Sequence, residues 1–181
     1  MSKQDKVNFM DLKDGAVIEG DLDLSWQTIA GLPGNLEVTR SLYLNYSRVD
    51  RMPKHLKVGC CLDCCGAKDM KMPDDLKVGG MMNLEESEIT QLPKNLVVGG
   101  TLNLKRTKIK KLPDNLVAGS VDISFTDIEE LPENLTVLNT LDISYTKITH
   151  IPDSLLLAGK IFVYGTGITK IPEHITVGKY C

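Results

Sequence analysis

The stretch Leu92-Pro-Lys-Asn-Leu-Val-Val-Gly-Gly-Thr-Leu-Asn-Leu-Lys-Arg-Thr-Lys-Ile-Lys-Lys111 is one copy of a repeat that runs through the chain. Leu-Pro, Met-Pro or Ile-Pro pairs begin at positions 32, 52, 72, 92, 112, 131, 151 and 171. Each copy reads L-P-x-N-L-x-V-G-G-x-L-x-L-x-x-T-x-I-x-x. Self-similarity at a fixed short period is the signature of a solenoid. We therefore expect a stack of about eight 20-residue coils.

Every copy contains an apolar–polar–apolar triplet, which has the period of a half-buried strand. The triplets are Leu22-Asp-Leu24, Leu42-Tyr-Leu44, Leu62-Asp-Cys64, Met82-Asn-Leu84, Leu102-Asn-Leu104, Val121-Asp-Ile123, Leu141-Asp-Ile143 and Ile161-Phe-Val163. They predict a β-rich solenoid with a parallel sheet on one face, in which the middle residue of each triplet points outward. Proline and glycine interrupt the segments between triplets, which leaves no room for a long helix.

Two further columns of the repeat have a structural interpretation. The glycine pairs, such as Gly99-Gly100, predict a bend with positive φ or a close approach between coils. A column that is mostly Ser or Thr follows the triplets, and it consists of Gln27, Ser47, Ala67, Ser87, Thr107, Thr126, Thr146 and Thr166. We expect these hydroxyl groups to satisfy one another and the bending backbone.

The chain divides into an N-terminal cap, residues 1–15, and a repeat solenoid, residues 16–181. The last segment, Ile175-Thr-Val-Gly-Lys-Tyr-Cys181, starts a ninth repeat and stops without a polar cap. An open sheet edge invites pairing with a second chain. This end of the solenoid therefore predicts a route to a homo-oligomer.

Residues 16–178 resemble the 20-residue leucine-rich repeats of bacterial type III secreted effectors and of bacterial and phage repeat proteins, with Thr in place of the usual Asn. The resemblance implies a parallel sheet on a concave face and protein binding as the task. Effectors of this kind that ligate ubiquitin carry a separate catalytic domain, and none is expected here. One departure is that Gly59, Gly79, Gly99 and Gly119 stand where the family has an apolar residue. The Leu-x-Val-Gly-Gly segment is then a second strand in the alternative fold, a closed right-handed β-helix.

Composition argues against nucleic-acid binding and against a membrane-spanning helix. The formal net charge is −3, which gives no general attraction to nucleic acid. No apolar run approaches the roughly 18 residues of a membrane helix. The polar start of the chain lacks the apolar run of a signal peptide. We expect a cytoplasmic protein, in the host cytosol if it is a secreted effector or a phage protein.

The densest cysteine cluster is Cys60-Cys-Leu-Asp-Cys-Cys65. Its Cys61-x-x-Cys64 spacing matches half of a zinc knuckle, but a tetrahedral site needs a second pair, and His55 lies in another part of the coil. Cys64 replaces a core leucine of the triplet, and buried cysteine behaves as a small hydrophobe. We expect structural thiols and no cofactor; a metal- or thiol-dependent protein is the alternative.

Catalysis finds little support in the sequence. Asp122 and Asp142 occupy the middle of neighbouring triplets, so their carboxylates are expected side by side on the outer face, where one pKa could rise. A solvated acidic face explains them equally well. The run Lys105-Arg-Thr-Lys-Ile-Lys-Lys111 carries five cations in seven residues. Acidic residues one coil away predict ion pairing rather than nucleic-acid binding. We expect a protein that is not an enzyme.

Aromatic residues mark the surface expected to bind a partner. The column after the triplet contains Trp26, Tyr46, Phe125 and Tyr145, which suggests an exposed ladder at each end. Tyr43, Phe162 and Tyr164 add rings on or beside the outer strand face. Aromatic residues are enriched in interface hot spots, although neighbouring rings can also stack simply to shield the corner. Together with Asp122 and Asp142, these residues predict a protein-binding module; a self-assembling structural protomer is a further alternative.

Overall fold

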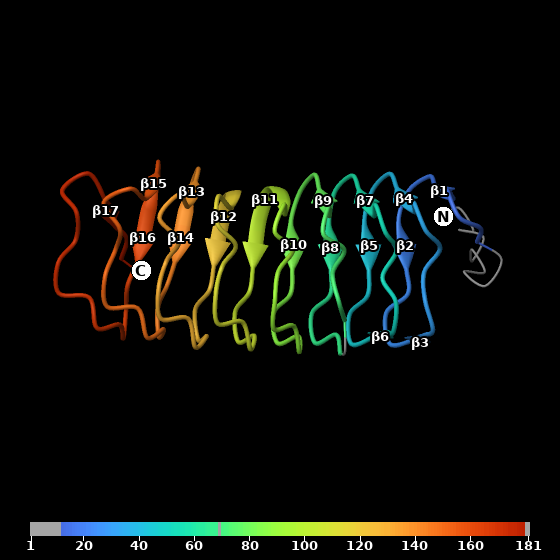
Figure 1. Ribbon diagram of the computed structural model, residues 1–181, viewed down its shortest axis with the longest axis horizontal. Coiled ribbons are helices and arrows are strands. Elements are labelled where there is room, and N and C mark those ends of the chain that lie inside the picture. Colours follow the sequence, from blue (N-terminus) through green and yellow to red (C-terminus); the bar gives the residue numbers. More distant parts are fainter. Residues whose placement is uncertain (1–11, 69, 180–181) are drawn as a thin grey trace.

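The computed structural model describes residues 12–68 and 70–179. It is a parallel β-solenoid of about eight coils, and the described residues contain no helix (Figure 1). The expectation of a β-rich solenoid is confirmed. Of the predicted cap, residues 1–11 lie outside the described residues.

Each coil contributes a strand to each of two rows of one 15-stranded sheet. The first row contains β1 (Val17–Ile18), β4 (Glu37–Val38), β7 (Lys57–Val58), β9 (Lys77–Val78), the start of β11 (Val97–Asn103), the start of β12 (Val117–Asp122), β13 (Thr136–Val137) and β15 (Leu156–Leu157). The second row contains β2 (Leu22–Asp23), β5 (Leu42–Tyr43), β8 (Leu62–Asp63), β10 (Met82–Asn83), the ends of β11 and β12, β14 (Thr140–Asp142), β16 (Lys160–Phe162) and β17 (Thr176–Val177). A separate pair, β3 (Thr28–Ile29) with β6 (Arg48–Val49), lies on a third side.

The second row is the predicted triplet strand, and the first row is the Leu-x-Val-Gly-Gly strand of the β-helix alternative. Leu102 pairs in parallel with Met82 on one side and Val121 on the other, so equivalent residues of successive copies lie beside one another. Leu102 and Leu104 are fully buried, whereas Asn103 between them is partly exposed. The repeat therefore stacks its leucines into one continuous core.

The glycine pairs allow close approach between coils. A Cβ on Gly79 would lie 2.1 Å from the carbonyl oxygen of Gly59, and one on Gly99 would lie 2.1 Å from that of Gly79. A positive φ is not found at these glycines, although Gly20 of the first coil has a φ of 100°. Close approach, rather than a left-handed bend, is therefore the reason for this column.

The hydroxyl column closes the corner after each second-row strand. The Oγ1 of Thr107 donates to the carbonyl oxygen of Leu104 at 2.7 Å, and those of Thr126 and Thr146 donate in the same way to residues three positions earlier. The hydroxyls thus satisfy their own coil's backbone rather than one another. Ser87 differs, because its buried Oγ has no hydrogen-bond partner among the described residues.

The ninth repeat departs from the period. In register, Thr176 would pair with Leu156, but β17 pairs with β16, placing Thr176 beside Lys160 and Val177 beside Ile161. The amide of Gly178 donates to the carbonyl oxygen of Ile161 at 2.7 Å. The predicted open edge is therefore partly covered in the second row, while in the first row β15 pairs, among the described strands, with β13 alone.

Candidate functional site

One column of residues turns the chain after every second-row strand, and we call it the corner column. It consists of Trp26, Tyr46, Gly66, Glu86, Arg106, Phe125, Tyr145 and Gly165, and every member has a positive φ between 53° and 64°. This left-handed region suits glycine and is unfavourable for other residues. The stacked coils hold six non-glycine side chains in it, all pointing away from the core and exposed.

The aromatic members of the corner column stack in pairs. The ring centroids of Trp26 and Tyr46 are 4.4 Å apart at an interplanar angle of 20°. Those of Phe125 and Tyr145 are 4.5 Å apart at 17°. The structure therefore brings the four predicted rings together as two ladders, in the stacked arrangement that the shielding alternative requires. Stacked pairs of this kind contribute about 0.5–1.5 kcal/mol beyond the area they bury.

Each aromatic stack ends on a glycine. A Cβ on Gly66 would lie 2.4 Å from the ring of Tyr46, and one on Gly165 would lie 2.6 Å from the ring of Tyr145. Both tyrosine rings therefore lean over the glycine of the following coil. The backbone at the glycine covers one face of each tyrosine ring. A residue with a Cβ at this position would collide with the ring.

Charged residues extend the second stack by two coils toward the N-terminus. The guanidinium of Arg106 lies 5.2 Å from the centroid of Phe125, which is within cation–π range. The same Arg106 reaches the carboxylates of Glu85 at 3.5 Å and Glu86 at 3.6 Å. This contact confirms that acidic residues one coil away neutralise part of the basic run. Side-chain contacts therefore run along the corner column from Glu86 to Tyr145, whereas the Trp26–Tyr46 stack ends at Gly66.

Stacking leaves the rings accessible. Trp26 remains 75% exposed and Tyr145 remains 54% exposed. Of the other predicted aromatics, Tyr164 is 40% exposed, whereas Tyr43 and Phe162 are half-buried. The Phe162 ring lies against Gly178, where a Cβ would be 2.6 Å away. Aromatic exposure is therefore concentrated at the corner rather than in the middle of the strands.

The strand-middle column has a backbone role that the sequence reasoning missed. The Oδ1 of Asp122 accepts the amide of Ser124 at 2.8 Å, and that of Asp142 accepts the amide of Ser144 at 2.9 Å. Asp and Asn side chains commonly make such bonds to the backbone two residues on. The two aspartates are paired in register, as expected. The Asp-x-Ser spacing was the available signal, and the bond gives Asp122 and Asp142 a structural role.

Asparagines extend this column into a side-chain ladder. The amide nitrogen of Asn83 donates to Asp63 at 2.9 Å, and that of Asn103 donates to Asn83 at 3.0 Å. Each amide links its coil to the one before it. The centre of the outer face is therefore a rigid polar strip between the two aromatic stacks.

The four described cysteines differ in their exposure. Cys60 is exposed, Cys61 and Cys65 are half-buried, Cys64 is fully buried, and all four thiols are free. Burial raises the pKa of the Cys64 thiol, so this side chain stays neutral. Across residues 12–68 and 70–179, no three His, Cys, Asp or Glu side chains are grouped so that they could hold a metal ion.

We expect Cys64→Ser to lower the free energy of unfolding by roughly 1–3 kcal/mol, because it puts a hydroxyl in a fully buried apolar site. Cys61→Ser is the matched control at a half-buried position and should leave stability and zinc content unchanged. Urea unfolding and metal analysis test both variants. Zinc that copurifies with the protein and is lost with Cys61 would contradict the structural interpretation.

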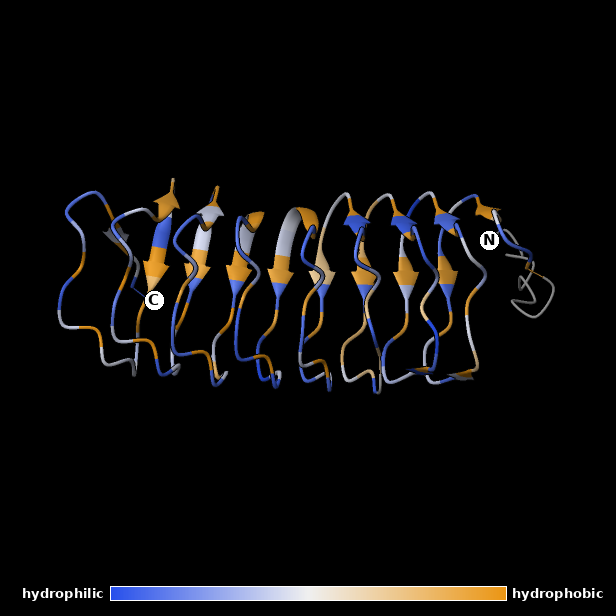
Figure 2. Cartoon of the chain, in the orientation of Figure 1, coloured by the Kyte–Doolittle hydropathy of each residue, from blue (hydrophilic) through white to orange (hydrophobic). Residues whose placement is uncertain are grey.

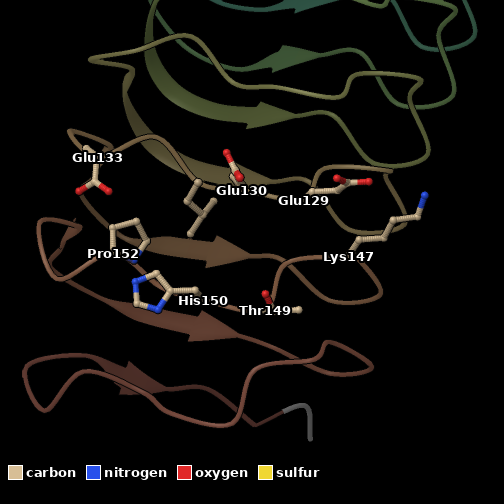
Figure 3. Close-up of a pocket in the computed structure, with 8 residues that line it drawn as sticks. Glu129, Glu130, Glu133, Lys147, Thr149, His150 and Pro152 are labelled. Atoms are coloured by element: carbon tan, nitrogen blue, oxygen red, sulfur yellow. The ribbon is translucent and has the colours of Figure 1, made fainter.

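A groove between neighbouring coils brings several titratable groups together. It is lined by Glu129, Glu130, Leu131, Glu133, Lys147, Thr149, His150 and Pro152 (Figure 3). Figure 3 shows Glu129 and Glu133 at opposite ends of the groove, so the carboxylates do not converge on one point. At the Glu129 end, Lys147 lies 2.8 Å from Asp127, and this pairing lowers the pKa of Asp127. These features are those of an ordinary charged surface exposed to solvent.

Histidine also forms a surface pair. The Nδ1 of His55 hydrogen-bonds the carboxylate of Asp75 one coil on, and this bond lowers the pKa of Asp75. Both side chains are exposed to a large extent. The pair bridges two turns of the solenoid, far along the sequence from the other two histidines, and it fits the expected surface role.

Comparisons with models of protein families, with curated proteins and with solved structures gave no match. The described part of the chain contains no helix long and apolar enough to cross a membrane.

Proposed function

We propose that this chain is a non-catalytic protein-binding module, acting as an adaptor, inhibitor or effector. The supporting observation is the exposure of Trp26, which stays three-quarters accessible although it stacks on Tyr46. Exposed rings lower solubility and are enriched at interface hot spots. We also propose, from the repeat pattern, that the chain is related to the leucine-rich repeat proteins and comes from a bacterium or a phage.

Rigidity of the corner supports the proposal. Each ring is fixed by a stacked neighbour and by a backbone conformation that the next coil repeats. A preorganised side chain loses little conformational freedom on binding, so more of its contact energy appears as affinity. The polar strip of Asp63, Asn83 and Asn103 between the stacks supplies hydrogen-bonding groups for the same partner.

The proposed contact surface comprises the corner aromatics and the outer strand face beside them. Its members are Trp26, Tyr43, Tyr46, Asp122, Phe125, Asp142, Tyr145, Phe162 and Tyr164. Free thiols fit a reducing compartment, and we place the protein in the cytoplasm.

We expect Trp26→Ser and Tyr145→Ser, one ring from each stack, each to weaken partner binding at least tenfold, which is about 1.4 kcal/mol. Both side chains are exposed, so the melting temperature should stay within a few degrees. Partner capture followed by mass spectrometry identifies the ligand, and calorimetry with the purified partner measures the affinity.

The matched control for the binding surface is Lys108→Ser with Lys110→Ser, which changes two exposed residues outside the corner column. Affinity should be nearly unchanged in this double variant. Loss of binding with the lysines and retention with the aromatics would move the partner to the basic segment and overturn the proposed surface.

A further inference from the structure

The two aromatic stacks repeat one arrangement along the corner column. Each consists of two rings from successive coils, with a glycine on the coil that follows. In the second stack, the guanidinium of Arg106 lies 5.2 Å from the centroid of Phe125. Arg106 belongs to the coil before Phe125 and Tyr145 to the coil after it, so the two cover opposite faces of the phenyl ring. The solenoid itself therefore places a guanidinium on the N-terminal face of an aromatic stack.

The first stack ends on an accessible ring. Tyr46 covers one face of Trp26, and within residues 12–68 and 70–179 no ring or cation lies over its other face. The indole is 75% exposed, compared with 45% for the ring of Phe125 beneath Arg106. Among aromatic side chains an indole attracts a cation most strongly. The accessible face of Trp26 thus matches the face of Phe125 that Arg106 covers.

The outer face around the first stack is acidic. The outward positions of the first four second-row strands, and of the corners after them, hold no lysine or arginine. Their acidic residues, which we call the acidic face, are Asp21, Asp23, Asp63, Glu85 and Glu86. The strands β2 and β8 each end on one of these aspartates, and Figure 2 shows the ends of both strands in blue, the colour of hydrophilic residues. Charge complementarity therefore favours a basic partner at this half of the solenoid.

The basic residues around the acidic face leave negative charge in excess. Arg40 pairs with Asp21 at 3.7 Å, and Arg106 pairs with the two glutamates at 3.5 and 3.6 Å. Five carboxylates thus meet two guanidinium groups. Beyond the corner, Arg48 is paired with an aspartate of its own coil, and Lys68 lies beside it on the third side of the solenoid.

Asp23 supplies a charged group on the same coil as Trp26. Its side chain is exposed, and its Oδ1 accepts the amide of Ser25 at 3.0 Å. The hydroxyl and the amide of Ser25 both hydrogen-bond this carboxylate and hold its pKa below the ordinary value, so it stays ionised at neutral pH. The first coil therefore combines an open indole face with a carboxylate, the two groups that Arg106 contacts in the second stack.

We propose that the partner presents a basic, arginine-containing segment to this end of the solenoid, with one guanidinium stacked on the accessible face of Trp26 and its other cations over the acidic face. The inference rests on the proposed protein-binding function and gives the chemistry of the partner. Arginine fits better than lysine, because its planar group stacks on a ring while its N–H donors remain directed at carboxylates.

The single tryptophan of the chain makes the site directly observable. The probe is the peptide acetyl-Gly-Arg-Gly-Arg-Gly-amide, and its control contains citrulline in place of arginine, which keeps the shape and removes the charge. The arginine peptide should change the fluorescence of Trp26 saturably, with a dissociation constant of about 1 mM or less. The citrulline peptide should bind at least about tenfold more weakly, because it lacks both the cation–π attraction and the ion pair.

Two matched substitutions locate the peptide. Asp23→Asn removes the charge and keeps the backbone hydrogen bond, since Asn83 makes the same bond to the amide of Glu85. It should raise the dissociation constant of the arginine peptide about threefold or more. Asp153→Asn removes the same charge from an exposed turn outside the second row and should leave the constant unchanged. Calorimetry should show no binding of the arginine peptide to Trp26→Ser.

Three results would overturn the arginine inference. They are equal binding of the two peptides, no change in Trp26 fluorescence up to about 10 mM arginine peptide, and undiminished peptide binding by Trp26→Ser. A partner whose affinity falls in Trp26→Ser, together with no binding of the arginine peptide, would leave the proposed surface standing without its arginine. Binding of the arginine peptide with unaltered partner affinity in Trp26→Ser would instead place the failure in the proposed function.

Discussion

Replacing Leu102 by aspartate is expected to unfold the protein or to lower its free energy of unfolding by more than about 4 kcal/mol. Leu102 is fully buried between Met82 and Val121 in the middle of the second row. A carboxylate there is desolvated between two coils whose facing side chains are apolar. Because each coil contacts only its neighbours, a break at this layer separates the two halves of the solenoid.

Asn103→Asp is the control for this substitution, because it places a carboxylate on the adjacent residue of the same strand. The side chain at position 103 points outward, and the equivalent positions in the two neighbouring second-row strands carry Asn83 and Asp122. The substitution removes the hydrogen bond that the Asn103 amide donates to Asn83, so we expect a loss of about 0.5–1.5 kcal/mol, well below that of Leu102→Asp. Urea unfolding followed by circular dichroism measures both variants. Similar stability of the two variants would mean that the side chains of residues 102 and 103 do not point inward and outward as described.

The period and the triplets were sufficient to predict the solenoid, the second row and its inward residues. Leu42, Leu62, Met82 and Leu102 repeat at one spacing, and in a stack one spacing fixes both the register and the burial of every coil. The sequence predicted the first-row strands only under the alternative fold, the closed β-helix. Most of its strands are two residues long, as in β7, and two residues carry too little alternation to identify a strand.

Backbone conformation at the corner could not be predicted from the sequence. A left-handed φ is signalled by glycine, and only Gly66 and Gly165 carry that signal in a column of eight. Aromatic and charged residues occupy the other positions because stacking on the neighbouring coil offsets the local cost. The shift of β17 was equally hidden, since Ile175-Thr-Val-Gly178 matches the repeat and only its pairing with β16 departs from it.

The second large effect is expected from Gly79→Ala, which should lower the free energy of unfolding by about 3 kcal/mol or more. Its Cβ would lie 2.1 Å from the carbonyl oxygen of Gly59, and that atom belongs to backbone held by its own coil. Relief requires neighbouring coils to separate, which lengthens the hydrogen bond from the Gly79 amide to the carbonyl oxygen of Val58, now 2.9 Å. The melting temperature and the midpoint of urea unfolding should both fall.

Gly34→Ala isolates the steric part of this effect. The nearest atoms to a Cβ on Gly34 would be those of the Asp14 carboxylate, at 3.4 Å, which is an ordinary contact. Both substitutions restrict the unfolded chain in the same way, a stabilising contribution of about 0.4–1 kcal/mol. The difference between the two variants therefore measures the contact between coils. If Gly79→Ala were as stable as Gly34→Ala, the coils would be free to move apart at Gly79. The glycine column would then need another explanation.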